Sequence, residues 1–133
     1  MPASGWFCEA CSSFAECATI GQEVKPAGST FAILIYADYL KAKDKDKLAP
    51  GLHIPTGTSP IFLTHGGEDI ISSPEQSVFM HLVPKRAGIP AELHIRASTA
   101  HDFGVRTRDR RWSPWTESCA HWLRHHGFLK FQP

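Results

Sequence analysis

The stretch PIFLTHGGEDIISSPEQ, residues 60–76, combines the signals of a strand, a turn and a helix. It opens with an apolar run, continues through His-Gly-Gly and Glu-Asp, and closes on Ser73 and Pro74, a typical helix start. Two acids and a histidine therefore stand where a buried strand would reach the surface. Such residues could form a phosphate-binding loop, a metal site or one corner of a catalytic triad.

The composition of the chain is that of one globular domain. Of its 133 residues, 42% are hydrophobic and 20% are charged, which is an ordinary balance for a folded domain. A net charge of +1 creates no strong attraction to nucleic acid or to a membrane surface. No apolar run approaches the roughly 20 residues of a membrane span. We therefore expect neither a nucleic-acid nor a membrane partner.

The N-terminus gives no indication of a cellular location. It lacks the basic start and the long apolar centre of a signal peptide. The sequence therefore predicts no signal peptide in this chain and leaves the compartment unknown.

Three short segments predict the strands of a parallel sheet. FAILIY (31–36) is continuous and without alternation, which is typical of a strand buried on both faces, and IFLTH (61–65) and AELHI (91–95) follow it. Strands separated by helical segments imply a parallel sheet with right-handed crossovers, so the predicted fold class is α/β. The outer edge of 31–36 would be open unless another chain or the N-terminal segment covers it.

Capping signals predict a helix after the second strand. Ser73 is the expected N-cap, Pro74 the first helical residue and Gln76 the partner of Ser73 in a capping box, and Gly88 is the expected stop. Pro84 predicts a kink or an early end, because proline removes a hydrogen bond inside a helix. The inner stripe is expected to consist of Val78, Leu82 and Val83.

A second helix is predicted over residues 113–127. Ser113 is the expected N-cap, Pro114 the first residue, Glu117 the capping-box partner and Gly127 the stop. The expected apolar face consists of Trp115, Cys119, Trp122 and Leu123.

The N-terminal region carries three of the four cysteines. Residues 8–20 look weakly helical, and Cys8 and Cys11 have C-x-x-C spacing, with Cys17 nearby. A histidine could complete a zinc site there, but no second cysteine pair exists, and reduced, partly buried thiols are the favoured interpretation. We expect no metal and no cofactor.

Two residues that follow different strands are candidates for catalysis. Asp69 comes just after the strand 61–65, and His101 lies in the loop after 91–95. Reacting groups of parallel α/β sheets gather beyond the carboxyl ends of the strands, so both side chains are expected at the same rim. A carboxylate that orients an imidazole general base is the supporting half of a nucleophile triad. The alternative is a surface aspartate in a turn and an unrelated loop histidine.

From about residue 31 to residue 128 the chain resembles the C-terminal portion of an α/β-hydrolase. It is most similar to the esterase and acyl-hydrolase group related to acetyl-xylan esterases, although Ala37 stands where that group usually has proline. The segments that carry the resemblance are FAILIYADYL, FLTHGGEDIISSPEQSV, KRAGIPAELHI, AHDFGVR and WTESCAHWLRHHGFL.

The resemblance implies a partial α/β-hydrolase fold and a set of roles. Residues 31–133 would be the C-terminal part of the hydrolase domain, and residues 1–30 a diverged N-terminal segment. Asp69 would be the triad acid and His101 the triad base, in the chain order Ser, Asp, His. Arg106 would fix the histidine loop. The implied substrate is a small ester or an acylated carbohydrate.

The nucleophile of such a triad is not evident. G-x-S-x-G, the turn that presents the serine, does not occur in the 133 residues. WFCEAC (6–11) can be laid against the corresponding segment, which makes Cys8 a weak candidate for a thiol nucleophile. Two hypotheses remain: a carboxylic-ester hydrolase, and a catalytically silent fragment that acts as an interaction module. A homo-oligomer or a complementing N-terminal chain is the expected partner.

Other motifs in the sequence do not indicate a separate site. The His-Gly-Gly of residues 65–67 comes just before the acid, Asp69, and after a late strand, so it is not an HGGG-type oxyanion loop. No G-K-[ST] follows for a phosphate cradle. His65 is interpreted as a strand-end residue, and Glu68 receives no role. His121 and His125 lie four apart without a third ligand, and RTRDRRW (106–112) is too short and isolated for a nucleic-acid patch.

Overall fold

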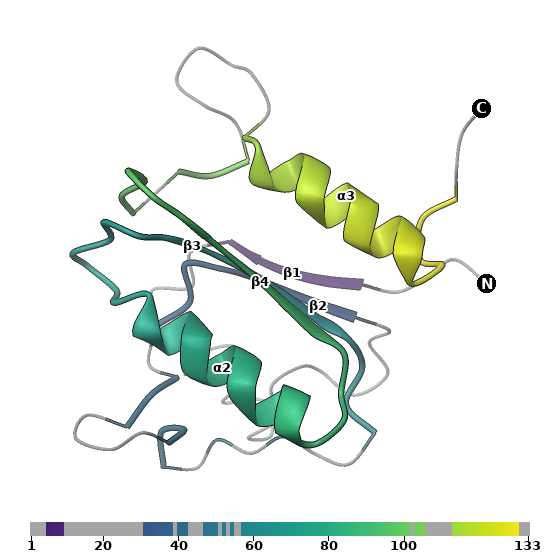
Figure 1. The fold of residues 1–133 in the computed structure, drawn as a ribbon, viewed down its shortest axis with the longest axis horizontal. Coiled ribbons are helices and arrows are strands. Elements are labelled where there is room, and N and C mark those ends of the chain that lie inside the picture. Colours follow the sequence, from purple (N-terminus) through teal and green to yellow (C-terminus); the bar gives the residue numbers. More distant parts are fainter. Residues whose placement is uncertain are drawn as a thin grey trace.

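A computed structural model of the chain shows a layered α/β structure (Figure 1). It describes residues 5–9, by their backbone, and residues 31–38, 40–42, 47–50, 52, 54, 57–101, 103–105 and 113–130. Several sequence predictions lie outside this part of the chain: the helix over residues 10–20, the thiols of Cys8, Cys11 and Cys17, and the basic segment 106–112 with Arg106.

The described sheet has four parallel strands that lie side by side in chain order. They are β1 (Gly5–Glu9), β2 (Phe31–Ile35), β3 (Ile61–Gly66) and β4 (Ala91–Arg96). The three strands expected from the sequence are confirmed, and the last residue of each lies one position from the expected one. The first strand was not predicted: Cys8 and Glu9 belong to β1, so the expectation of helix is wrong for these two residues.

Strand β1 pairs with the outer edge of β2, which was expected to be open unless another segment covered it. The two strands pair in parallel, with Trp6 opposite Ala32 and Cys8 opposite Leu34. The N-terminal segment therefore supplies the cover, which removes a row of unpaired backbone groups that would otherwise be an aggregation hazard.

Helices pack on both faces of the sheet (Figure 1). Helix α2 (Glu75–Arg86) covers one face and α3 (Trp115–His125) the other. Along β2, Ala32 and Leu34 pack in the α2-side cluster with Met80, whereas Ile33 and Ile35 pack in the α3-side cluster. This two-sided burial is the reason that the strand has no polar alternation, as parallel sheets covered on both faces require.

Helix α2 differs from its prediction at its N-terminus, at Pro84 and in its buried face. Its N-cap is Pro74 rather than Ser73. Gln76 does not close a capping box, because its Oε1 accepts hydrogen bonds from the backbone N–H groups of Leu40 and Lys41 at 2.9 and 2.6 Å. The helix continues through Pro84 to Arg86, so it does not end early. The buried residues of α2 are Ser77, Met80 and Pro84, not the predicted stripe of Val78, Leu82 and Val83, which are only partly buried.

Helix α3 has the predicted apolar face but not the predicted cap. Trp115, Cys119 and Trp122 are buried, and Leu123 packs partly against the same cluster. The Ser113 hydroxyl does not cap the helix, because it donates to the carbonyl of Phe103 at 3.1 Å. Gly127, with a φ of 74°, lies just past the end of the helix, as expected for a glycine stop.

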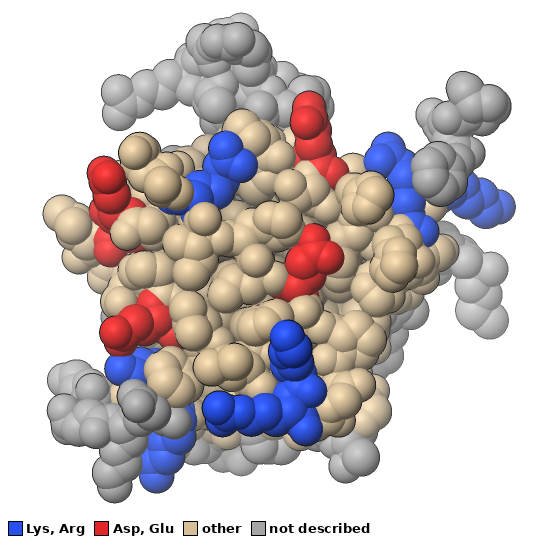
Figure 2. All heavy atoms as spheres, in the orientation of Figure 1, with Lys and Arg blue, Asp and Glu red and all other residues tan. Residues whose placement is uncertain are grey.

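The surface of the described residues carries mixed charges. On the face shown in Figure 2, acidic and basic side chains are scattered among uncharged residues. The described residues visible on this face form no continuous basic patch. None of the helices in the described part of the chain has the length and apolarity required to cross a bilayer.

The core on the α3 side depends on Phe62. This side chain is fully buried, with its ring centroid 5.6 Å from that of Trp122. We expect Phe62→Ala to lower the free energy of unfolding by about 3–5 kcal/mol, because it leaves a cavity in the core. Ile70→Ala is the control, since Ile70 is 97% exposed and its truncation should change stability by about 0.5 kcal/mol or less. Urea unfolding measures both variants, and equal effects would contradict the assigned core.

Candidate active site

The turn after β3 carries Asp69 and is hydrogen-bonded to the loop after β4. The backbone N–H of Gly67 donates to the Arg96 carbonyl at 2.8 Å, and that of Glu68 donates to the Thr99 carbonyl at 3.0 Å. The two loops therefore run against each other at the carboxyl ends of neighbouring strands. Asp69 is buried in this arrangement, while Glu68 points to solvent.

Gly66 permits this close approach of the two loops. A Cβ at residue 66 would collide with the backbone carbonyl oxygen of Thr99 and would lie 2.7 Å from that of Ala100. Because both atoms belong to the backbone, no side-chain movement could relieve the contact. A residue without a side chain is therefore required at the end of β3.

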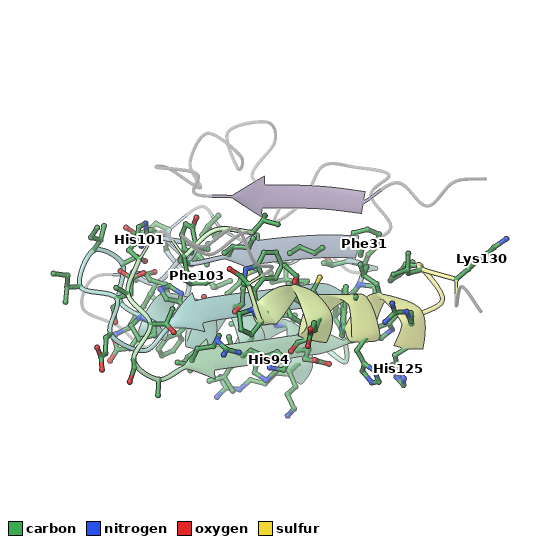
Figure 3. The ribbon with its side chains drawn as sticks, turned by 90° about the horizontal axis from the view of Figure 1, so that it is seen from above. Phe31, His94, His101, Phe103, His125 and Lys130 are labelled. Carbon is green, nitrogen blue, oxygen red and sulfur yellow. The ribbon has the colours of Figure 1, made fainter. Side chains whose placement is uncertain are left out.

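The structure brings Asp69 and His101 into direct contact. His101 Nδ1 lies 2.6 Å from Asp69 Oδ2. His101 lies at the end toward which the strand arrows point, whereas Phe31, at the start of β2, lies at the opposite end (Figure 3). The two sequence candidates thus meet at one rim of the sheet, from the turn after β3 and the loop after β4.

The carboxylate of Asp69 is held by several N–H groups. Its Oδ1 accepts hydrogen bonds from the backbone N–H groups of Ile71 and Ser72, both at 2.9 Å, and its Oδ2 accepts from His101. Burial by itself would raise the pKa of Asp69, but the hydrogen bonds from Ser72, His101 and Ile71 outweigh it and lower the pKa below its usual value. Asp69 is therefore an ionised acceptor.

The aromatic ring of Tyr36 lies beside the imidazole of His101. The ring of Tyr36, directly after β2, has its centroid 4.6 Å from that of His101 and 4.8 Å from that of Phe103. Tyr36 adopts a φ of 37°, in the left-handed region that non-glycine residues rarely occupy, while its N–H donates to the Thr64 carbonyl at 2.8 Å. Such strain is common at functional sites, where the surrounding structure fixes the residue.

The loop after His101 is anchored to the start of α3. Trp115 Nε1 donates to the Gly104 carbonyl at 2.7 Å, and the Ser113 N–H donates to the Val105 carbonyl at 2.9 Å. The predicted anchor, Arg106, lies outside the described residues. The described anchors instead come from residues 113 and 115.

Sequence reasoning missed the part that His65 plays in this site. The residue is not a simple strand end, because its side chain is fully buried and its Nε2 lies 3.2 Å from Asp69 Oδ2. The available signal was its spacing four residues before Asp69. That spacing became meaningful only once the turn between them was known.

The two helical histidines do not join this site, and of Cys8 only the backbone is described. His121 and His125 are exposed on α3, and no group of three potential metal ligands is gathered within the described ranges. Cys8 lies one residue before the end of β1, with its backbone opposite Leu34. The geometry can therefore support acid–base chemistry: with Nδ1 held by Asp69, Nε2 of His101 is the nitrogen that can accept a proton.

The ionised state of Asp69 makes stability depend on pH. Because its pKa is lowered in the folded state, its stabilising contribution is present above the unfolded pKa of about 3.9 and is lost as the pH falls through the folded pKa. We expect Asp69→Asn to lower the free energy of unfolding by about 1.5–3 kcal/mol at pH 7. The difference from the wild type should narrow below about pH 4.

Denaturant unfolding between pH 7 and pH 2 measures this difference. Glu68→Gln is the matched control, because the neighbouring carboxylate is exposed, and its profile should follow that of the wild type. A wild-type advantage over Asp69→Asn that stays constant down to pH 2 would contradict the assignment.

Comparisons with known proteins support the fold. No family model matches the chain, and no curated protein matches it either. Several solved structures, in contrast, match the chain. Esterase 2 of Thermogutta terrifontis, phosphonylated by cyclosarin, superposes with a TM-score of 0.64 at 21% identity, over 82% of this chain and 48% of that one.

Two further structures agree with this result. The acetyl ester-xyloside bifunctional hydrolase of Caldicellulosiruptor lactoaceticus matches with a TM-score of 0.57 at 23% identity, over 77% of this chain and 44% of its own. A carboxylesterase of Lactobacillus plantarum matches with a TM-score of 0.62 at 15% identity, over 78% and 47%. The chain thus spans about half the length of these structures, and it has the α/β-hydrolase fold, of which it corresponds to a C-terminal portion.

Proposed function

We propose that the chain carries the acid and the base of an ester-hydrolysing triad. His101 is the general base, and Asp69 orients its imidazole and stabilises the imidazolium that forms. The observation that carries this proposal is the 2.6 Å contact between Asp69 Oδ2 and His101 Nδ1 at the carboxyl ends of β3 and β4. That rim is where α/β folds gather their reacting groups.

The substrate class is a carboxylic ester. Structures with the same fold include an esterase, a carboxylesterase and an acetyl ester-xyloside hydrolase. By analogy with them, we propose acyl or acetyl esters, including those of acylated carbohydrates, as substrates. The triad needs no cofactor, because the imidazole and the nucleophile perform both proton transfer and acyl transfer.

The nucleophile has two candidate sources. One is Cys8, which stands near the carboxyl end of β1 and hence, in a parallel sheet, toward the same rim as Asp69. The other is a serine on a polypeptide that completes the fold, since the chain spans under half of the esterase structures. A second copy of the chain is not a further source of this serine, because it would add no G-x-S-x-G.

A catalytically silent module is the second candidate function. The 133 residues contain no G-x-S-x-G motif, which favours this alternative. Ile70 and Ile71, directly after Asp69, are 97% and 68% exposed. Exposed apolar side chains at one site are typical of surfaces that a partner covers. Size-exclusion chromatography with light scattering separates the alternatives, because a stable, compact monomer argues against dependence on a partner.

The hydrolase proposal predicts that activity depends on one of the eight histidines. With p-nitrophenyl acetate as substrate, we expect His101→Ala to lower kcat/KM at least about 100-fold, because general-base catalysis contributes about that much. His125→Ala is the matched control, since His125 is exposed on α3, and it corrects for slow hydrolysis by any accessible imidazole.

Two further measurements identify the nucleophile. Loss of turnover in Cys8→Ala assigns the reaction to this chain's own thiol, whereas labelling by a fluorophosphonate indicates a serine. A wild-type rate equal to that of His101→Ala, with no labelling, would exclude the isolated chain as an enzyme.

A further inference from the structure

A second histidine contacts the Asp69 carboxylate from inside the protein. His65 on β3 is fully buried, and its Nε2 lies 3.2 Å from Asp69 Oδ2. His101 Nδ1 lies 2.6 Å from the same oxygen. One carboxylate oxygen is therefore shared by two imidazoles, of which one is enclosed in the core and the other reaches the rim.

The partners of His65 determine which of its nitrogens carries the proton. Nε2 lies 3.0 Å from the Ser72 carbonyl oxygen as well as near Asp69. A carbonyl and a carboxylate can only accept hydrogen bonds, so Nε2 must be the N–H. Burial holds the pKa of His65 below its usual value, which favours the neutral ring at pH 7. Nδ1 is then an acceptor, and the Ser77 hydroxyl, 2.7 Å away, donates to it.

We propose that His65 is a positioning residue for the Asp69–His101 pair: a neutral Nε2–H donor that keeps Asp69 Oδ2 directed at His101. This inference rests on the proposed function, because it assigns a role within the same site. It names a residue that neither contacts the substrate nor transfers a proton.

The need for this donor follows from how the carboxylate is held. Oδ1 is fixed by the backbone N–H groups of Ile71 and Ser72. Of the described contacts, those that hold Oδ2 come only from the two imidazoles. Without His65, Oδ2 would be held by His101 alone, the group whose own orientation it must set. Ser77 ties the His65 ring to α2, so the helix fixes the direction of the carboxylate.

The neutral state of His65 is as important as its position. A charged imidazolium beside Asp69 would oppose the positive charge that His101 acquires as a general base, because like charges disfavour each other. A neutral N–H still stabilises the ionised carboxylate. The neutral donor therefore keeps the proton on His101 and disfavours its transfer to Asp69.

Nuclear magnetic resonance of the full chain, labelled with ¹⁵N-histidine, tests the inference without any substrate. Ring nitrogen shifts report the tautomer, and single-histidine variants assign the signals. In the wild type we expect His65 to stay in the neutral Nε2–H form at pH 6.5, where a free histidine is about half protonated. The Nδ1–H proton of His101 should give a downfield signal protected from exchange with solvent.

Two substitutions at residue 65 form a matched pair. In His65→Gln the amide nitrogen stands near the position of Nε2 and retains a donor toward Asp69. In His65→Asn the amide nitrogen corresponds to Nδ1, so that donor is lost. We expect the His101 signal to persist in His65→Gln and, in His65→Asn, to disappear or to exchange at least about tenfold faster. If His65→Asn does not fold, Ser77→Ala replaces it, with the same expected acceleration.

Several results would overturn the inference. A His65 that carries its proton on Nδ1, or that is charged at pH 6.5, contradicts the proposed donor. The proposed donor is also contradicted if the His101 Nδ1–H proton exchanges at the wild-type rate in a folded His65→Asn or Ser77→Ala variant. Failure of the proposed function gives a different pattern. The protein then shows no ester turnover, while His65 keeps its Nε2–H tautomer and the His101 proton still exchanges faster in His65→Asn than in His65→Gln.

Discussion

The parallel alignment of β3 and β4 is the constraint on which the candidate site depends. Parallel neighbours end at the same edge of a sheet, so the residues that follow them emerge together. Thr64 lies opposite His94, and Gly66 opposite Arg96. Residues 69 and 101, which are 32 positions apart in sequence, can therefore be joined by a 2.6 Å hydrogen bond. In an antiparallel pair, the corresponding turns would lie at opposite ends of the sheet.

The rim is also built so that this contact has little freedom to change. The Glu68 N–H binds the Thr99 carbonyl, and the absence of a side chain at Gly66 lets the two loops approach. Asp69 is buried, and both of its carboxylate oxygens accept hydrogen bonds from N–H groups. Such preorganisation suits the role proposed for Asp69, that of orienting His101, because the geometry is already set before a substrate arrives.

Much of the sheet and the central pair of residues could be predicted from local sequence. The runs at 31–36 and 61–65 are apolar because helices cover both faces of the sheet there, and that burial leaves a clear pattern. Residues 91–95 form a strand that is only partly buried. The meeting of Asp69 and His101 followed from strand order alone.

The features that were missed depend on contacts distant in the sequence. GWFCE in β1 is short and has no periodic pattern, and its pairing partner lies more than twenty residues later. Gln76 fitted a local capping box, yet it binds the backbone of residues 40 and 41, a partner 35 or 36 positions away. His65 looked like a strand end until the turn after β3 placed Asp69 against its ring.

A double-mutant cycle between residues 69 and 101 tests the central contact most directly. The free energies of unfolding of Asp69→Asn, His101→Gln and the double variant are compared with that of the wild type. A hydrogen bond between an imidazole and a buried carboxylate predicts a coupling energy of about 1.5–3 kcal/mol. Effects that add to within about 0.5 kcal/mol would show that the two side chains do not interact, and the site described for this rim would then be wrong.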